Sequence, residues 1–274
     1  MEYSPKKTKE ILEKENFNLK KKFGQNFIVD ENIIDMIIKK ANIDKDTLVL
    51  EIGPGAGALT YKLAKTAKNV LCYEIDTTLK PVLEKNLKEF TNVNIIYRDF
   101  LSENITLEIE KYTFNNFYIV ANLPYYITTP ILMKVIEEQL PLDKIIIMVQ
   151  KEVGDRFKAK PNSKDYNSLS VYLNYYFDIK KILDISRNVF IPKPNVDSVV
   201  LELNKKNQIY LKNERLFFKL VRDSFKQKRK NLRNNLKDYD LIKIEKILKK
   251  YNFDLTARAE QLSIDIFVDI ANNI

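Results

Sequence analysis

The sequence predicts an α/β fold: a mostly parallel sheet covered by helices on both faces, followed by a small all-α domain. Between residues 47 and 150, uniformly apolar segments of strand length alternate with segments of helical spacing. That alternation is typical of parallel strands buried on both faces. After residue 205 only helical patterns remain. We therefore expect one domain over residues 1–204 and a second over residues 205–274.

Each element follows from local patterning. Residues 1–22 are polar and basic and are interpreted as an arm, and Asp30 can cap a helix that runs to Lys40. The strands expected in the first domain are 47–52, 69–75, 93–97, 117–121 and 144–150, with helices at 59–67, 79–89 and 131–139. Two further strand-like segments lie near residues 168–177 and 196–203, and the second domain is expected to contain helices at 214–236, 241–250 and 257–272.

Composition narrows the possible chemistry. The chain of 274 residues is 45% hydrophobic and contains no histidine and one cysteine, Cys72. Histidine-based triads, histidine general bases and most zinc sites are therefore excluded, and we expect no metal site. The longest apolar runs, such as residues 145–149, are far too short to span a bilayer. A single cysteine and an N-terminus without an apolar stretch favour a cytoplasmic protein, which we expect to be monomeric.

The positive charge is concentrated in one segment. The net charge is +9, and residues 205–237 contain twelve Lys or Arg against two acids. This segment therefore carries +10 and the remainder of the chain −1. Such a concentration suggests a polyanionic partner.

If residues 214–237 form one helix, its cations fall into a stripe about 100° wide, and its apolar side chains lie toward the other side. Such a stripe suits the phosphates of RNA. The residues assigned to RNA binding are Lys219, Arg222, Lys226, Arg229, Lys230 and Arg233.

A glycine-rich turn follows the first strand. The segment EIGPGAGA places Gly53 and Gly55 at a strand-to-helix turn, where a ligand can approach the backbone closely. Glu74, at the end of the second strand, is at the right distance to bind a ribose. Asp99, just past the third strand, could accept a hydrogen bond from an adenine amino group. This pattern leaves two cofactors open, NAD and S-adenosylmethionine.

The segment after the fourth strand indicates which chemistry applies. It reads Asn122-Leu-Pro-Tyr-Tyr-Ile. An adenine amino group is a poor nucleophile because its lone pair is delocalised into the ring. An Asn side-chain oxygen and a backbone carbonyl, placed on its two N–H bonds, would localise that lone pair and aim it at a sulfonium methyl, and Pro124 would stiffen the loop. Tyr125 could stack on a base turned out of its helix or loop. No strong base is needed.

The loop NLPYYITTPIL resembles a motif of the ribosomal RNA adenine N6,N6-dimethyltransferases. The segments KKFGQNFIVD, LEIGPGAGALT, VFIPKPNVDSVV, FKQKRKNLRNNL and RAEQLS also resemble that family, in the same order, over nearly the whole chain. The RAEQLS and FIPKPNVDS segments look like its small-subunit branch.

The resemblance implies a Rossmann-like methyltransferase fold that uses S-adenosylmethionine. It implies dimethylation of two adjacent adenines in the 3′-terminal hairpin loop of small-subunit ribosomal RNA, within an immature small subunit. It also implies residue roles. Asn26 and Ile28 would close over the cofactor, Gly53 and Gly55 would lie under it, Glu74 would bind its ribose and Asp99 its adenine. Asn122 would hold the target amino group, Leu123 would contribute its carbonyl, and Tyr125 and Phe190 would flank the target base.

Four alternatives remain. A large-subunit methyltransferase of the antibiotic-resistance type shares the chemistry. A ribosome-assembly factor that mainly binds would not need the intact catalytic motifs. An NAD-linked oxidoreductase would leave the basic segment unexplained. A DNA adenine methyltransferase usually carries Asn/Asp-Pro-Pro-Tyr in place of Asn122-Leu-Pro-Tyr.

Overall fold

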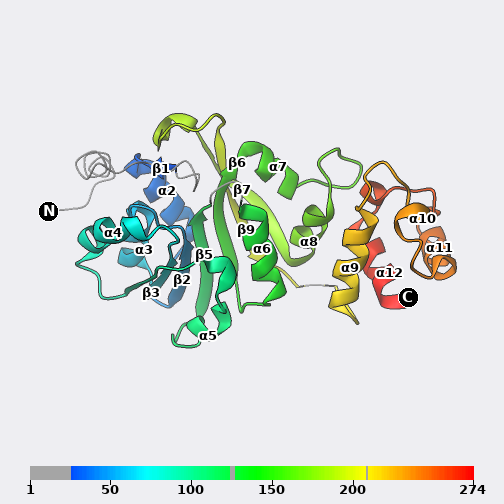
Figure 1. Ribbon diagram of the computed structural model, residues 1–274, viewed down its shortest axis with the longest axis horizontal. Coiled ribbons are helices and arrows are strands. Elements are labelled where there is room, and N and C mark those ends of the chain that lie inside the picture. Colours follow the sequence, from blue (N-terminus) through cyan, green and yellow to red (C-terminus); the bar gives the residue numbers. More distant parts are fainter. Residues whose placement is uncertain (1–25, 124–126, 208) are drawn as a thin grey trace. The chain divides into compact units, whose positions relative to one another are not determined.

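A computed structural model of the protein describes residues 26–123, 127–207 and 209–274 (Figure 1). The basic arm predicted over residues 1–22 and the site residues Pro124 and Tyr125 lie outside the described residues. Among the helices that are described, none combines the length and the apolar character needed to cross a membrane.

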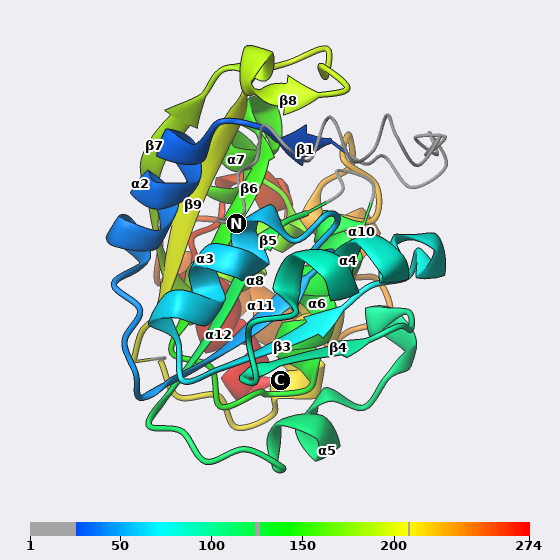
Figure 2. The same cartoon turned by 90° about the vertical axis from the view of Figure 1, so that its left-hand side faces the viewer.

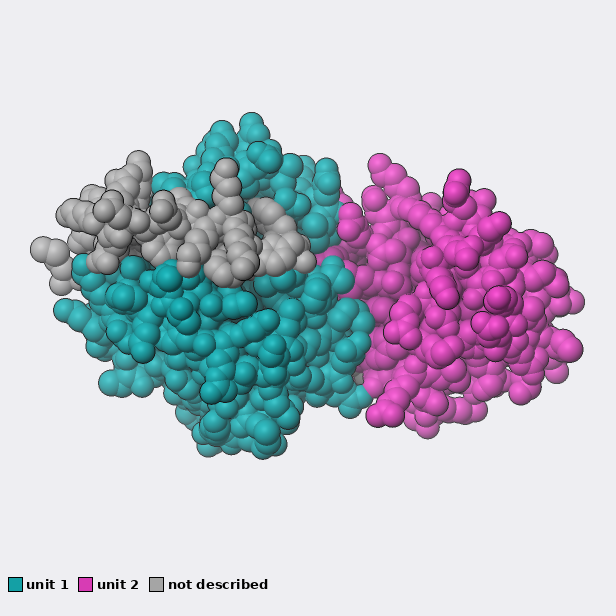
Figure 3. Space-filling model, viewed as in Figure 1, with its two compact units in different colours: residues 1–154, 180–204 teal, residues 155–179, 205–274 magenta. Residues whose placement is uncertain are grey.

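The chain divides into two compact units (Figure 3). Unit 1 consists of Met1–Gly154 and Lys180–Asn204, and unit 2 consists of Asp155–Ile179 and Lys205–Ile274. The boundary expected near residue 205 is one of the points at which the chain passes between units. The sequence-based division differs from this one because it places residues 155–179 in the first domain. The contacts of this segment with the C-terminal helices join residues that are far apart in the chain, so no local sequence pattern indicates them.

Unit 1 is an α/β structure. Its strands are β1 (Phe27–Ile28), β2 (Thr47–Ile52), β3 (Asn69–Tyr73), β4 (Val93–Ile96), β5 (Asn116–Asn122), β6 (Lys144–Gln150), β8 (Phe190–Ile191) and β9 (Ser198–Lys205), with β7 (Phe177–Ile185) beginning in unit 2. Its helices are α2 (Glu31–Ala41), α3 (Ala58–Thr66), α4 (Lys80–Leu87), α5 (Ile105–Ile109), α6 (Thr128–Glu137) and most of α7 (Lys151–Phe157), with short 3-10 turns η2 (Thr77–Leu79), η3 (Phe100–Ser102) and η4 (Arg187–Val189).

The main sheet has the order β4-β3-β2-β5-β6-β9-β7 among the described residues. The first five of these strands are parallel, and β9 pairs antiparallel with β6. The chain builds outward from β2 through β3 to β4 and then returns to place β5 on the other side of β2. Strand order therefore reverses between β2 and β5, and in open α/β sheets ligands bind at the carboxyl ends of the strands beside such a point.

Both faces of the sheet are buried, as its uniformly apolar strands predicted. Val49, Val70 and Val120 pack in one core with residues of α2 and α3, and Figure 2 shows α3 and α4 in front of the strands. The alternate residues Leu48 and Leu50 are fully buried on the opposite face. Asp30 caps α2 as expected, its side chain accepting a hydrogen bond from the Asn32 N–H at 3.0 Å.

A separate two-stranded sheet joins distant motifs. β1 pairs antiparallel with β8, in the register Phe27 to Ile191 and Ile28 to Phe190. The N–H of Val29 extends the pairing by donating to the Val189 carbonyl at 3.0 Å. The FIVD and VFIP segments of the sequence are therefore one structural element.

Unit 2 is mainly helical. It contains α8 (Ser168–Tyr176), α9 (Glu214–Ser224), α10 (Leu232–Asn235), α11 (Leu241–Lys249), the 3-10 turn η5 (Ala259–Gln261) and α12 (Ile264–Asn273). The strand predicted near residues 168–177 is wrong, because this segment is helix α8. Its Tyr and Val content favours a strand, but Asn167 and Ser170 form a capping box that starts a helix.

Aromatic side chains join α8 to α9. The ring of Tyr175 lies 5.0 Å from that of Phe217, and the ring of Tyr172 lies 4.8 Å from that of Phe218, centroid to centroid. The Tyr172 hydroxyl also donates to the Phe218 carbonyl at 2.8 Å. Aromatic pairs of this kind add to the burial of apolar area, so residues 155–179 are held to the C-terminal helices by their largest side chains.

The single helix predicted over residues 214–237 is also wrong. Helix α9 ends at Ser224, where the Asn235 side-chain amide donates to the Ser224 carbonyl at 2.7 Å and to the Gln227 carbonyl at 3.2 Å. A new helix, α10, then starts behind Asn231, whose side chain accepts from the Asn234 N–H. Residues 225–230 form turns, because Asn side chains satisfy the backbone groups that a continuous helix would pair internally.

The break in this helix is open to a stability test. Gly lowers helix stability by about 1 kcal/mol relative to good helix formers. Arg222→Gly, on the exposed face of α9, is expected to lower the free energy of unfolding by about that amount. Arg229→Gly, in the turn, is expected to change it by only a few tenths of a kcal/mol. Urea denaturation of both variants provides the measurement, and equal losses would indicate a continuous helix.

Candidate functional site

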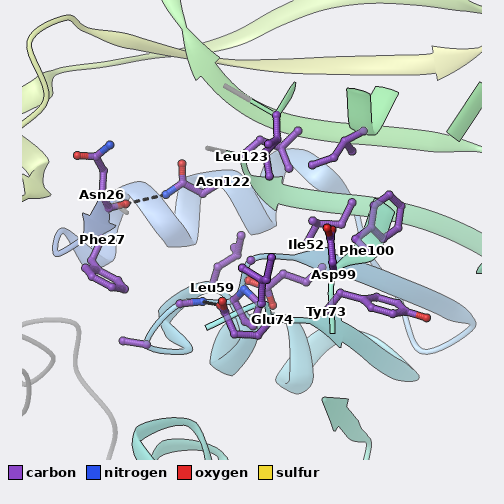
Figure 4. Close-up of a pocket in the computed structure, with 18 of the residues that line it drawn as sticks. Asn26, Phe27, Ile52, Leu59, Tyr73, Glu74, Asp99, Phe100, Asn122 and Leu123 are labelled. Atoms are coloured by element: carbon purple, nitrogen blue, oxygen red, sulfur yellow. Dashed lines mark hydrogen bonds between the residues drawn. The ribbon is translucent and has the colours of Figure 1, made fainter. Parts of the chain in front are cut away.

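A cavity lies at the carboxyl ends of β2, β3 and β5, within unit 1. We call it the strand-end cavity (Figure 4). Its lining residues are Asn26, Phe27, Ile28, Glu51, Ile52, Gly53, Pro54, Gly55, Ala56, Ala58, Leu59, Tyr73, Glu74, Ile75, Arg98, Asp99, Phe100, Leu101, Asn122, Leu123, Ile127 and Ile131. It is therefore placed where the reversal of strand order opens a crevice.

The glycine-rich turn forms the floor of the cavity. Gly55 has φ +59°, a left-handed conformation that side chains rarely adopt, and a Cβ added there would lie 2.9 Å from the Phe27 ring. Gly57 precedes α3 and offers no side chain to cap it, so main-chain N–H groups at the start of this helix stay available to a ligand. The glycines thus permit both the turn and the close approach of β1.

Glu74 is buried in the wall, with 4% of its surface exposed. One carboxylate oxygen accepts from the Gly55 N–H at 3.1 Å and the other accepts from the Asp76 N–H at 2.8 Å. Burial raises the pKa of Glu74, and these two backbone N–H groups oppose the shift by stabilising the charged form. Each oxygen keeps a further lone pair, so the group can accept hydrogen bonds from two vicinal hydroxyls.

Asp99 lies at the rim and is exposed. One of its oxygens accepts from the Leu101 N–H at 2.9 Å, which fixes the carboxylate at the start of η3. The second oxygen can accept from an amino group in the cavity. Ile75, which is 48% exposed, also lines the cavity and offers an apolar surface to a flat ring.

Asn122, the last residue of β5, is oriented by the residue that precedes β1. Its side-chain Nδ2 donates to the main-chain carbonyl of Asn26 at 2.9 Å (Figure 4). Because only the NH₂ end of a carboxamide can donate to a carbonyl, the bond determines which end is Oδ1. That oxygen remains available as an acceptor at the cavity.

Comparison with known proteins identifies the family. A family model described as ribosomal RNA adenine dimethylase matches residues 16–274. The chain belongs to the ribosomal RNA adenine dimethylase family. It is 45% identical to the ribosomal RNA small subunit methyltransferase A of Bacillus pumilus, covering 98% of this chain and 96% of that protein. It is 43% identical to the protein of the same name from Oceanobacillus iheyensis, covering 98% and 95%.

Solved structures agree on the fold. A dimethyladenosine transferase from Plasmodium falciparum is 25% identical, with a TM-score of 0.74 over 89% of this chain and 95% of that one. The 23S rRNA methyltransferase ErmE is 24% identical, with a TM-score of 0.67 over 89% and 97%. The expected Rossmann-like methyltransferase fold is confirmed.

The cofactor of this rRNA adenine dimethylase is S-adenosylmethionine, as expected. The strand-end cavity has a lining that suits this cofactor: Glu74 keeps carboxylate lone pairs that could accept from ribose hydroxyls, and helix N–H groups and apolar side chains also line the cavity. NAD, the other ligand that the glycine pattern left open, is excluded by the family.

The structure brings together most of the predicted site residues. Those that line the strand-end cavity are Asn26, Ile28, Gly53, Gly55, Glu74, Asp99, Asn122 and Leu123. Phe190 is not among them. It is 3% exposed and packs in the core with residues of α2 and α3, because β8 is covered when it pairs with β1. In this structure its ring is a core aromatic, and its role beside the target base stays a prediction.

The sequence interpretation missed Glu51. This residue lies in β2, is 1% exposed and lines the cavity. The sequence did contain an indication that Glu51 is functional. An acid inside an otherwise apolar strand, two residues before a glycine turn, is costly to bury unless it has a function.

The basic residues of unit 2 do not form the predicted stripe. Arg222 is exposed on α9, Arg233 is at the start of α10, and Lys226, Arg229 and Lys230 are exposed in the turn between those helices. Lys219 is less available than these residues to bind a phosphate, because its ammonium donates to Asp223 at 2.9 Å and to the Tyr239 hydroxyl at 3.0 Å.

A substitution at Glu74 tests the ribose position. Glu74→Ala is expected to raise the Kd for S-adenosylmethionine at least about tenfold, since it removes charge-assisted hydrogen bonds. Calorimetric titration measures this, and thermal unfolding verifies that the variant is folded. Glu84→Ala, an exposed carboxylate on α4, is the control and should leave the Kd unchanged. An unaltered Kd for Glu74→Ala would rule out the ribose role.

Proposed function

We propose that this protein methylates N6 of two adjacent adenines in the 3′-terminal hairpin loop of small-subunit ribosomal RNA, adding two methyl groups to each. The relatives that match over nearly the whole chain carry the name ribosomal RNA small subunit methyltransferase A. The observation on which the chemistry rests is the oriented carboxamide of Asn122 at the strand-end cavity.

Asn122 holds the nucleophile. Its Oδ1 accepts a hydrogen bond from one N–H of the adenine amino group, and the Leu123 carbonyl accepts from the other. The nitrogen lone pair is then drawn out of conjugation and directed into the cavity. Bound S-adenosylmethionine would supply an electrophilic methyl carbon: the C–S bond breaks as the N–C bond forms, the neutral thioether is the leaving group, and the methylated nitrogen gives up a proton to solvent. Positioning therefore contributes most of the rate, which agrees with a chain that has no histidine.

The remaining assignments concern cofactor and base. Glu74 accepts from the ribose hydroxyls and Asp99 from the adenine amino group of the cofactor. Asn26, Ile28, Gly53 and Gly55 enclose its methionine and ribose portion. Tyr125 stacks on the extruded target base and Pro124 stiffens the loop that presents it; both lie outside the described residues.

RNA binding is assigned to the cations between α9 and α10. Lys226, Arg229 and Lys230 are exposed on consecutive turns, and Arg222 and Arg233 are exposed on the helices that flank them. The Lys228 ammonium donates to the Lys164 carbonyl at 2.8 Å, which anchors this turn within unit 2. A firm, cationic turn suits the phosphates of a folded RNA better than a free basic tail.

The alternatives are less well supported. The names of the near-full-length relatives disfavour a large-subunit methyltransferase. The complete set of cavity residues around Asn122 disfavours an assembly factor that acts only by binding. We propose an immature small subunit as the substrate particle, the cytoplasm as the location, and a monomer as the active form.

The catalytic assignment is tested at Asn122. Asn122→Ala is expected to bind S-adenosylmethionine with a Kd within a few-fold of the wild type. It is expected to transfer methyl groups at least about a hundredfold more slowly, because the nucleophile is no longer positioned. The assay uses labelled cofactor with immature small subunits, followed by mapping of the modified nucleotides. Wild-type activity in the variant would refute the role of Asn122, and unmodified adenines with the wild-type enzyme would refute the proposed function.

The RNA surface is tested by charge reversal. The triple change Arg229→Glu, Lys230→Glu and Arg233→Glu is expected to weaken RNA binding and to reduce the slope of log K against log salt by up to about three. Cofactor affinity should be preserved. The matched control reverses three exposed lysines of α11, Lys243, Lys246 and Lys249. Equal effects of the two triple changes would argue for nonspecific charge rather than this turn.

A further inference from the structure

The strand-end cavity contains a second buried acid that the proposed mechanism does not use. Glu51 lines the cavity and is 1% exposed, so its carboxyl is removed from bulk water. It lies beside Cys72, its register partner on β3. An ionised carboxylate in such a place is costly unless it is paired or well supplied with hydrogen-bond donors.

The hydrogen bonds of the two buried acids differ. Glu74 accepts from two backbone N–H groups, at 3.1 Å and 2.8 Å. Glu51 accepts from the Cys72 thiol at 3.7 Å, and a thiol is a weak donor. Two carboxylates near one cavity repel each other, and the one with the poorer donors takes up the proton.

The charged and titratable groups around Glu51 do not offset the cost of ionising its carboxyl. Cys72 on β3 and Glu74 just beyond it face Glu51, and Thr60 on α3 adds a hydroxyl nearby. Arg98, the cation among the described residues lining the cavity, is directed to Glu103, with 3.1 Å between Nη1 and Oε2. Burial raises the pKa of Glu51 to about 8, with Glu74 adding to the shift, while Thr60 and Cys72 act against it.

S-adenosylmethionine carries a net positive charge at neutral pH, from an ammonium, a sulfonium and one carboxylate. We propose that Glu51 is a charge-recognition residue, protonated in the empty cavity and ionised when the cationic cofactor binds, so that binding exchanges a proton for the cofactor. The O–H bond of the carboxylic acid breaks, its electron pair remains on Glu51, and the proton passes to solvent. This inference rests on the proposed use of the strand-end cavity for S-adenosylmethionine.

The exchange has a defined pH dependence. At pH 7 a carboxyl with a pKa of about 8 is about nine-tenths protonated, so binding releases about one proton. Affinity for the cofactor then rises with pH, by nearly tenfold per unit well below that pKa. The stability of the free protein changes with pH in the opposite direction. Because the pKa of Glu51 in the folded state lies above its unfolded value, the stability contributed by its protonation is lost as pH rises through about 8.

The test is calorimetric titration of S-adenosylmethionine near pH 7 in phosphate, HEPES and Tris, buffers with different enthalpies of ionisation. The slope of observed enthalpy against buffer enthalpy counts the protons released. We expect about one for the wild type and about none for Glu51→Gln, which mimics the protonated acid and keeps any contribution from the ligand's own amino group. Glu84→Gln, an exposed control on α4, should match the wild type.

The outcomes separate the two proposals. A wild-type enthalpy that does not depend on the buffer would overturn the proton exchange while leaving cofactor binding intact. A complete failure to bind S-adenosylmethionine would overturn the use of this cavity. If Glu51→Gln binds too weakly to titrate, the wild-type buffer series still decides. Unfolding of the free variant should also lack the loss of stability between about pH 4.5 and about pH 8 that is expected of the wild type; an equal loss in both would contradict the assignment to Glu51.

Discussion

One hydrogen bond connects the two sides of the active site. The Asn122 carboxamide donates to the Asn26 carbonyl across 96 positions of sequence, and it can do so only because β1 is paired with β8 and lies over the glycine-rich turn. The segment that we propose covers the cofactor and the residue that we propose holds the target nitrogen are therefore positioned by the same contact. Any movement of the segment at β1 would change the direction in which Asn122 presents its acceptor oxygen, so the two proposed roles, cofactor enclosure and nucleophile alignment, would be coupled by geometry.

The parts of the fold that were predictable are those in which periodicity and burial coincide. Segments such as residues 47–52 and 144–150 are apolar because both sheet faces are covered, and they were predicted to the residue as β2 and β6. The errors occurred where long-range contacts override local preference. The tyrosine-rich sequence of α8 is typical of a strand, yet the segment is a helix whose aromatic rings pack on α9. The end of α9 depends on the Asn235 side chain, eleven residues beyond Ser224.

The candidate site likewise contains residues that the sequence could place and residues that it could not. Residues at strand ends, such as Glu74 and Asn122, are placed by topology alone, so their convergence follows from the order of the strands. Phe190 could not be placed by its motif, because its burial depends on how β8 meets β1. The role of Glu51 was not apparent from its strand, because sequence patterning treats an acid among apolar neighbours as incidental. Only the structure shows that this residue lines the strand-end cavity.

The discontinuity of unit 2 has a consequence for synthesis and evolution. Its N-terminal part, residues 155–179, is made before the last strands of the sheet, whereas its aromatic partners on α9 follow residue 205. On the ribosome, Tyr172 and Tyr175 must wait for about forty further residues before Phe217 and Phe218 are available to cover them. Natural recombination that replaced only the tail after residue 205 would bring together surfaces that had not evolved with each other. Exchange of this unit between relatives therefore requires three crossovers, one at each junction between the units, that preserve the same aromatic packing.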